Sequence, residues 1–292
     1  MKKQAALASA ILIIGLLLGG AVGHALASPG GGLTTILEPG STESGASAIV
    51  FKDSDGVVYY RKSNGDVITD GDTAPDEIQE AINYVGSLGG GTVLISRGKY
   101  DLDTAITVPA GVTLEGEDMW KTELHATGDI TLIDLSDAPT ETIKKLYVKV
   151  RNLHLSGTSN LGVGIKAYYV GYAYIENVQI EDFYYGISYS GAWKLHINGF
   201  DIKDCTTGIA HFNCPEGILS DPIIEYGRIH ACSDTGIYIE GKTGGGAVIS
   251  NVEIGSVPKG IRIQGGEWHF ISNVVIDMCN DKGFIIDPPS GI

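Results

Sequence analysis

The sequence predicts an all-β protein in which one chain winds into a parallel β-helix, preceded by a cap helix and a small β-meander. Two series of landmarks support this prediction, since each recurs every 22 to 28 residues, an interval typical of one coil of a solenoid. The first is the Ile or Leu that ends an apolar segment, and the second is the Gly that opens the next segment. They are Leu155, Ile180, Ile202, Ile229, Ile254 and Ile276, and Gly164, Gly186, Gly208, Gly236, Gly260 and Gly283.

Each repeat contains two short segments of alternating apolar and polar residues, separated by Gly, Asn, Asp and Ser. Alternation with β-branched residues predicts strands, and the separating residues predict turns. A unit of this length cannot bury its own apolar face, so successive coils must stack through parallel strands about 4.8 Å apart.

Stacking predicts columns of equivalent side chains. One Asn column can hydrogen-bond along the stack, and an interior column contains three thiols. The thiols fit either buried apolar groups or a Cys205–Cys232 disulfide between neighbouring coils. The columns are Asn152, Asn177, Asn251 and Asn273, and Phe183, Cys205, Cys232, Val257 and Cys279.

The N-terminus has the pattern of a secretory signal peptide over residues 1–27. Lys2 and Lys3 precede an apolar run, and Ala25-Leu26-Ala27 is a small-residue cleavage pattern. An uncleaved membrane anchor is the alternative, because the apolar run is at the lower limit for spanning a bilayer. Both interpretations predict a secreted or cell-surface protein.

The charge of the chain limits its partners. Without Lys2 and Lys3, 18 basic residues face 35 acidic ones, a formal net charge of −17. A phosphate backbone would be repelled, which argues against nucleic acid. A polyanion such as pectate would need a bridging cation, so calcium is the one cofactor left open, although the sequence identifies no metal-ligand set.

The residues before the coils divide into a flexible linker over 28–47, rich in Gly, Ser, Thr and Pro, and a β-meander over 48–70. The β-helix is predicted over 71–292. Its first element is a helix capped by Asp72 or Thr73, which covers the edge of the first coil. The buried face of that helix is predicted to consist of Ile78, Ala81, Ile82, Val85 and Leu88.

No helix is visible at the other end of the solenoid. Pro288 and Pro289 would block further ladder hydrogen bonds. Either these prolines are the whole cap, or the C-terminal end packs on another subunit as a homo-oligomer.

The segments "APDEIQEAINYVGSLGGGTVLISRGKY", from Ala74, and "VTLEGEDMWKT", from Val112, carry a resemblance to a known family. With the coils that follow, they resemble the pectate-lyase-like superfamily of right-handed parallel β-helices, which includes tailspike-type proteins, polygalacturonase-like hydrolases and related lyases. The resemblance covers residues from about Gly71 onward. It implies a right-handed coil and a polysaccharide or other glycan as partner.

The chain has only some of the residues that resemble the active residues of polygalacturonase-like hydrolases. Gly260-Ile261-Arg262-Ile263-Gln264 is similar to the polygalacturonase Arg strand, with Gln264 in place of Lys. Of the acids that such hydrolases place before the repeated Gly, only Asp234 and Asp281 are present. Glycoside hydrolysis needs two carboxyl groups about 5 to 9.5 Å apart, and these two lie two coils apart.

The outward positions of the Gly-Ile-x-Ile strands form the first candidate site. Asp234, Glu240 and Arg262 are its candidate catalytic residues. Aromatic rings beside polar groups suit a sugar, and the alternative is that these rings only cover neighbouring coils. The candidate binding residues are Tyr238, Gln264, Phe212, Trp193 and Trp268.

The outward positions of the other strand form a second cluster. It contains Lys203, Arg228 and His230 together with Glu181, Asp201 and Glu253. The favoured interpretation is a surface ladder of ion pairs. The functional alternative is β-elimination of a uronic acid, with Lys203 or His230 as the base.

Two functions follow from these observations. The first is an exported lyase or glycoside hydrolase that binds and cleaves a polysaccharide. The second is a non-catalytic surface or appendage module that binds glycan or assembles through its C-terminal end. The incomplete set of acids leaves both open.

Overall fold

The computed structural model describes residues 45–68, 73–137, 145–213, 220–241, 246–265 and 268–287. The predicted signal peptide, Asp72, Cys214 and the two C-terminal prolines lie outside these residues. Within the described ranges, no helix is long and apolar enough to cross a membrane. Gly45–Ile292 is one compact unit.

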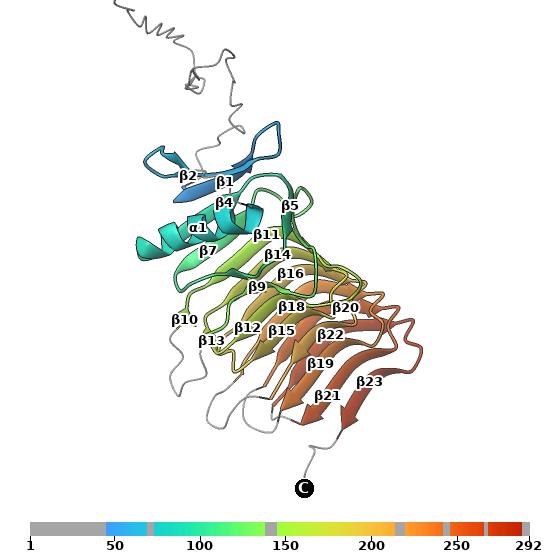
Figure 1. The fold of residues 1–292 in the computed structure, drawn as a ribbon. Helices are drawn as coiled ribbons and strands as arrows, with labels where there is room; N and C mark the ends of the chain where they lie inside the picture. The colour runs from blue at the N-terminus through green and yellow to red at the C-terminus, as the bar shows by residue number, and fades with distance from the viewer. Residues whose placement is uncertain are drawn as a thin grey trace, which may run out of the picture. The chain divides into compact units, whose positions relative to one another are not determined.

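The predicted parallel β-helix is confirmed: successive coils stack, and each contributes strands to two long sheets (Figure 1). The first sheet has the order β22-β20-β18-β16-β14-β11-β7-β4-β1-β2-β3, with β5 and β8 attached beside β11. Its strands are β1 (Ala48–Lys52), β2 (Val58–Lys62), β3 (Val67–Ile68), β4 (Gly91–Ile95), β5 (Gly98–Leu102), β7 (Val112–Gly116), β8 (Thr122–Ala126), β11 (Lys149–Ser156), β14 (Tyr174–Glu181), β16 (His196–Lys203), β18 (Ile223–His230), β20 (Val248–Gly255) and β22 (Phe270–Asp277).

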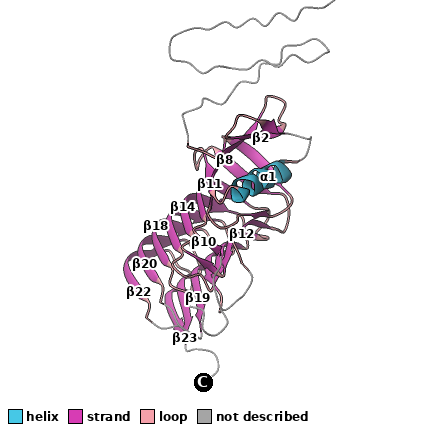
Figure 2. Cartoon of the chain, turned by 90° about the vertical axis from the view of Figure 1, so that its left-hand side faces the viewer, coloured by secondary structure: helices cyan, strands magenta, loops and turns pink. Residues whose placement is uncertain are grey.

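The second sheet has the order β23-β21-β19-β17-β15-β12-β9-β6, and a short pair of strands, β10 and β13, lies at one corner of the coils. Figure 2 shows the coils from the side. The strands are β6 (Ile106–Thr107), β9 (Thr131–Asp134), β12 (Val163–Tyr168), β15 (Tyr185–Ser190), β17 (Thr207–His211), β19 (Thr235–Gly241), β21 (Lys259–Gly265) and β23 (Lys282–Asp287), with β10 (Lys145–Leu146) and β13 (Val170–Gly171) at the corner.

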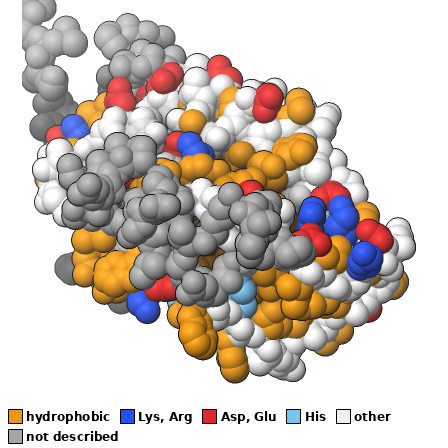
Figure 3. All heavy atoms as spheres, turned by 90° about the horizontal axis from the view of Figure 1, so that it is seen from below, with side chains coloured by type: hydrophobic (Ala, Val, Ile, Leu, Met, Phe, Trp, Pro, Cys, Tyr) orange, Lys and Arg blue, Asp and Glu red, His pale blue; other side chains and the backbone are white. Residues whose placement is uncertain are grey.

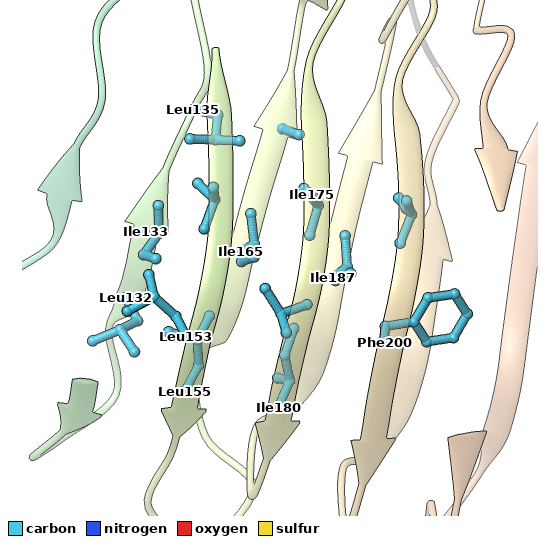
Figure 4. Close-up of a cluster of buried hydrophobic side chains, with 14 of the residues drawn as sticks. Leu132, Ile133, Leu135, Leu153, Leu155, Ile165, Ile175, Ile180, Ile187 and Phe200 are labelled. Carbon is cyan, nitrogen blue, oxygen red and sulfur yellow. The ribbon is translucent and has the colours of Figure 1, made fainter. Parts of the chain in front are cut away.

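The strands pair in the register that the repeat predicts. Val252 pairs with Val274, and the six anchor residues from Leu155 to Ile276 pair one after another. All of the anchors up to Ile254 are completely buried. Figure 4 shows such residues layered in the interior between the two sheets. The core is therefore a set of continuous apolar columns.

The repeated Gly is required because the interior has no room for a side chain there. A Cβ on Gly208 would lie 2.6 Å from Ile229 Cγ2 and 2.7 Å from the carbonyl oxygen of Gly236 in the next coil. The same two kinds of contact recur at Gly164, Gly186, Gly236 and Gly260. These glycines let the corner of one coil pack against the next.

We expect Gly208→Ala to lower the free energy of unfolding by about 1–3 kcal/mol, the usual cost of overpacking a close-packed interior. Gly128→Ala is the matched control, because a Cβ there would meet no atom within 4 Å. Chemical denaturation of both variants measures the difference. Equal stability of the two would contradict this role for the Gly column.

The Asn column marks a bend in four strands of the first sheet, β11, β14, β20 and β22. All four Asn residues have φ between 49° and 57°, a left-handed conformation that Asn tolerates better than most residues. The predicted ladder is confirmed, since Asn273 Nδ2 donates to Asn251 Oδ1 at 2.5 Å and Asn177 Nδ2 donates to Asn152 Oδ1 at 3.4 Å. Sequence reasoning predicted the ladder and missed the bend.

The N-terminal edge is covered by α1 (Ala74–Ser87) and by the meander β1–β3, whose strand β1 pairs directly with β4. Ile78, Ala81, Ile82 and Val85 are completely buried, as predicted. The prediction for Leu88 was wrong: this residue is 55% exposed. It follows the last helical residue, where the chain turns away toward Gly89.

Cys205, Cys232 and Cys279 are free thiols, so the alternative of a Cys205–Cys232 disulfide was wrong. Cys205 and Cys232 are buried in the predicted interior column between Phe183 and Val257. Burial raises the pKa of the Cys232 thiol to about 12. These thiols are therefore uncharged and act as small apolar groups.

Candidate functional site

The first candidate residues lie on the outer face of the second sheet, and they do not form one cluster. Asp234 directly precedes β19, whereas Glu240 is six residues further along the same strand. Six residues of strand correspond to roughly 20 Å. These two carboxyl groups are therefore too far apart to flank one glycosidic bond.

Two of the three candidate catalytic residues on this face, Asp234 and Arg262, are held in ion pairs. Lys259 Nζ lies 2.5 Å from Asp234 Oδ1, and Arg262 Nε donates to Asp287 Oδ2 at 2.8 Å. Partial burial raises the pKa of Asp234, but hydrogen bonds from Lys259 and Thr235 and the charge of Arg262 outweigh burial and leave it below its usual value. A carboxylate held ionised in this way is a poor general acid.

The aromatic rings on this face pack mainly on one another. Phe212 lies between Tyr185 and Tyr238, with ring centroids 5.2 Å and 6.4 Å apart. The Tyr238 hydroxyl donates to Gln264 Oε1 at 2.9 Å, and Arg262 lies over the Tyr238 ring. The geometry agrees with the alternative that these rings cover neighbouring coils.

The two predicted tryptophans lie away from that row. Trp193 packs edge-on against Tyr172 at the corner formed by β13, with ring centroids 4.9 Å apart. Trp268 is 88% exposed in the connection between β21 and β22. The structure therefore separates the five predicted binding residues into a row on the second sheet and two tryptophans outside that row.

The second cluster is brought together as predicted, on the outer face of the first sheet. Asp201 accepts two hydrogen bonds from Arg228, both at 3.3 Å, and lies 3.2 Å from His230 Nε2. Glu181 binds Lys203 at 2.5 Å and His154 at 2.9 Å. The favoured interpretation, a ladder of ion pairs across coils, matches these contacts.

The ladder also limits the chemistry of Lys203. Its hydrogen bond to Glu181 raises the pKa of the Lys203 ammonium, although partial burial opposes this change. A raised pKa keeps the amine protonated, which opposes its use as a general base. His230 keeps one hydrogen bond to Asp201. Of the two residues considered as the base for β-elimination, Lys203 and His230, it is therefore the better candidate.

An open groove runs across this outer face and includes part of the second cluster. Its lining combines the exposed rings of Trp120 and Tyr226 and the nearly buried Phe200 with two valines and with carboxylate, guanidinium and amide groups. The lining residues are Trp120, Phe200, Asp201, Tyr226, Gly227, Arg228, Asn251, Val252, Glu253, Asn273 and Val275. The groove thus crosses β16, β18, β20 and β22.

Local departures from the repeat create this groove. Tyr226 takes the place of Asn in the Asn column, has φ 53°, and leaves its ring 60% exposed. Gly227 takes the place of the buried Val, and a Cβ there would lie 2.3 Å from the ring of Phe200. Phe200 therefore fills the space above Gly227, and Figure 4 shows its ring directed away from its own strand.

Sequence reasoning found the charged part of the groove and missed the aromatic part. Trp120 lies in the turn before β8, inside the segment that carried the family resemblance, and is 62% exposed. Tyr226 and Gly227 interrupt the Asn-Val pattern in one repeat. That interruption could have indicated the groove from the sequence, because a residue that departs from a structural repeat has lost the structural reason for its identity and can instead serve binding.

No group of three or more His, Cys, Asp or Glu side chains suited to a metal ion occurs within the described ranges. Calcium is therefore retained only as the prediction made from charge.

His211 and Tyr189 form a buried polar pair inside the second sheet. Their rings stack with centroids 4.8 Å apart, and both side chains are at least nine-tenths buried. The Tyr189 hydroxyl and both His211 nitrogens make no hydrogen bond of normal geometry to another group of the described chain. Burial, with a smaller contribution from the charge of His269, lowers the pKa of His211 from 6.5 to about 4.

This pair predicts a pH dependence of stability. Because the folded pKa of His211 is lower than the unfolded value, the unfolded chain binds the proton more tightly and stability falls as pH drops below about 6.5. His211 should account for about 2 kcal/mol of the loss between pH 7 and pH 5. His211→Phe keeps the stacked ring and removes the titration, so denaturation curves at both pH values should show a smaller loss for this variant. An unchanged loss would contradict the prediction.

Comparisons with known proteins agree with the fold. Residues 144–286 match the family model described as right handed beta helix region. No curated protein matches the sequence. The resemblance to right-handed parallel β-helix proteins is thus confirmed.

Several solved structures have a similar fold. The catalytic domain of a GH87 alpha-1,3-glucanase in complex with nigerose has a TM-score of 0.56 and 13% identity over 76% of this chain and 44% of that chain. A variant of such a domain in complex with tetrasaccharides has a TM-score of 0.54 and 14% identity over 71% and 38%. The A-module of an Azotobacter vinelandii mannuronan C-5 epimerase has 18% identity over 74% and 73%, with a TM-score of 0.38. The chain spans less than half the length of the glucanase domains.

Proposed function

We propose that the protein binds a neutral polysaccharide in the groove across β16, β18, β20 and β22. The observation that carries the proposal is the combination of two exposed rings, Trp120 and Tyr226, with hydrogen-bonding groups along one open groove. Sugar rings have an apolar face that packs on aromatic rings, and their hydroxyl groups bind carboxylates, amides and guanidinium groups.

The charges in the groove favour a neutral glycan over a uronate polymer. Arg228 is the basic residue that lines it, and two hydrogen bonds to Asp201 already offset its charge. Glu253 adds an exposed carboxylate. The full chain has a formal charge of −15, so a polyuronate would be repelled both locally and at long range unless a cation such as calcium bridged it.

The openness of the groove and its length favour an extended ligand. From β16 to β22 there are three steps between neighbouring strands, so the groove is about 14 Å long at the usual strand spacing. A polymer can continue past both ends of such a groove, whereas a small metabolite would be left largely in water. The GH87 alpha-1,3-glucanase domains with a similar fold have structures in complex with nigerose and with tetrasaccharides, which supports the same ligand class here.

Export of the chain is part of this proposal, because extracellular glycans would be its ligands. The signal peptide lies outside the described residues, so export rests on the sequence pattern alone. Mass spectrometry of the mature N-terminus checks it: a chain that keeps Met1 in the cytoplasm would contradict it.

Trp120→Ala and Tyr226→Ala should each weaken binding to the recognised glycan about tenfold, since aromatic anchors typically contribute more than 1 kcal/mol. The probes are soluble neutral oligosaccharides, and calorimetry measures the affinity. Trp268→Ala is the matched control, because this ring is exposed but does not line the groove. Weakening by Trp268→Ala alone would place binding elsewhere and contradict the proposal.

Cleavage of the bound glycan is the second candidate function, favoured by the positions of Asp201 and Glu253. They point outward from β16 and β20, two rungs apart, which is about 10 Å between Cα atoms. A two-coil spacing is marginal for hydrolysis, as it is for Asp234 and Asp281, so cleavage is secondary to binding in this proposal.

Product analysis of the same oligosaccharides tests this candidate. New reducing ends that disappear in both Asp201→Asn and Glu253→Gln would support hydrolysis. Binding without any product, in the presence and in the absence of calcium, would leave the protein as a non-catalytic binding module.

A further inference from the structure

Among the described residues, four histidines lie on the outer face of the first sheet, and one is bound differently from the other three. The three bind a carboxylate through Nε2, in keeping with the pairing of opposite charges that Figure 3 shows on the surface. These pairs are His154 with Glu181, His196 with Glu225, and His230 with Asp201, at 2.9, 2.8 and 3.2 Å.

His125 of β8 is the exception. Its Nδ1 lies 2.8 Å from Ser156 Oγ, and none of the described residues forms a hydrogen bond with its Nε2. That nitrogen is not buried, so a small group can reach it. His125 therefore presents one ring nitrogen to whatever binds on this face.

The position of the His125 proton follows from the charge of Glu123. Partial burial raises the pKa of Glu123, but hydrogen bonds from Ser156 and Lys99 outweigh burial and leave the pKa below its usual value. An ionised carboxylate only accepts hydrogen bonds, so Ser156 Oγ donates its single hydrogen to Glu123 Oε1, at 2.7 Å. The Ser156 oxygen then accepts from His125 Nδ1–H. Because a neutral imidazole carries one proton, Nε2 is left with a free lone pair.

This chain of hydrogen bonds prepares His125 to act as a general base. A partner on Nδ1 fixes the tautomer and the orientation of the ring, and a carboxylate behind it stabilises the imidazolium that forms when Nε2 takes a proton. Ser156 is only 5% exposed, and its hydrogen is already donated to Glu123. Ser156 is therefore a positioning residue and not a nucleophile.

The groove of the first sheet reaches this group. Trp120 lines the groove and lies in the turn that leads into β8. His125 follows Trp120 by five residues, which span at most about 18 Å. A glycan that packs on Trp120 can therefore bring a substituent to His125. Lys99, whose side chain is 49% exposed and lies 3.2 Å from Glu123, places a cationic donor beside the base, where it can stabilise a developing oxyanion.

A single base of this kind suits the hydrolysis of an ester better than the hydrolysis of a glycosidic bond. Glycoside hydrolysis requires two carboxyl groups on either side of the bond. Ester hydrolysis needs one group that removes a proton from water and later returns it to the leaving oxygen, and a histidine does both.

We propose that His125 is the general base of an esterase site that removes acyl groups, such as O-acetyl groups, from a neutral polysaccharide. The choice of substrate rests on the proposed function of the groove. His125 Nε2 takes a proton from a water molecule, whose oxygen forms a bond to the acyl carbon. The bond between that carbon and the sugar oxygen then breaks, and His125 returns the proton to the sugar oxygen. The products are a carboxylic acid and a free sugar hydroxyl.

The proton position can be tested without any substrate. Nitrogen NMR of the isotope-labelled protein should show that His125 is protonated at Nδ1 and unprotonated at Nε2. Ser156→Ala should move the proton toward Nε2, because the hydrogen bond that selects the tautomer is lost. The signals are assigned by their disappearance in His125→Gln. A His125 that carries its proton on Nε2 in the unaltered protein would overturn the proposal.

Release of acetate from O-acetylated xylo- and gluco-oligosaccharides tests the reaction. His125→Gln should lower kcat at least about a hundredfold, the usual contribution of a general base. Ser156→Ala should lower kcat about tenfold and leave KM unchanged, because it alters the orientation of the base and not the binding of the glycan. His196→Gln is the matched control, since its Nε2 already binds Glu225, and it should leave acetate release unchanged.

p-Nitrophenyl acetate separates this proposal from the proposed function, because so small an ester does not need the groove. Hydrolysis of p-nitrophenyl acetate that depends on His125, without binding or deacetylation of any oligosaccharide, would support the base and reject the neutral glycan as its substrate. Binding of the oligosaccharides without acetate release from either kind of ester would overturn the esterase site and leave the groove as a binding site. Acetate release that is unchanged in His125→Gln would also overturn it.

Discussion

In-register pairing of parallel strands is the constraint on which the rest of the structure depends. Each coil places one Ile or Leu above that of the coil before it, from Leu155 to Ile254, and these side chains are completely buried. A slip of one residue would turn every such column to the outside. Register therefore determines the core, and through the core it determines which outward side chains become neighbours.

The functional groove arises where the repeat is interrupted. Two consecutive coils show the change: Phe200 occupies the place of a Val, Gly227 makes room for its ring in the next coil, and Tyr226 of that coil replaces an Asn at the bend. The surrounding coils keep the regular pattern and hold these residues in place. A rigid repetitive scaffold with a few irregular positions is a sound basis for a binding site, since little conformational freedom is lost on binding.

Much of this architecture could be predicted from the sequence. The coil length, the register, the cap helix and the outward columns all follow from spacing, because a solenoid converts sequence interval into spatial contact. The disulfide could not be decided, because sequence spacing allows both a bond and free thiols. The aromatic side of the groove was missed because Trp120 and Tyr226 come from turn and bend positions, whose side-chain directions depend on backbone angles rather than on strand alternation.

The charged residues show that aligning equivalent positions of successive coils does not predict which side chains are reactive. Lys203 and Asp234 were candidates for proton transfer, and both are paired so that their protonation states are held. Partners of this kind come from the neighbouring coil, but which partner is selected depends on side-chain length and direction. The repeat therefore predicts well which side chains lie close together, but it predicts poorly which of them can transfer a proton.

Disulfide trapping tests the register most directly. Arg228 and Glu253 are paired on adjacent strands and both point outward, so cysteines at these two positions lie within the range of Cα separations for a disulfide. The combination Arg228→Cys with Glu253→Cys should cross-link rapidly under mild oxidation. His230→Cys with Glu253→Cys, displaced by two residues, should not. Equal or faster cross-linking of the displaced pair would contradict the register and the groove built on it.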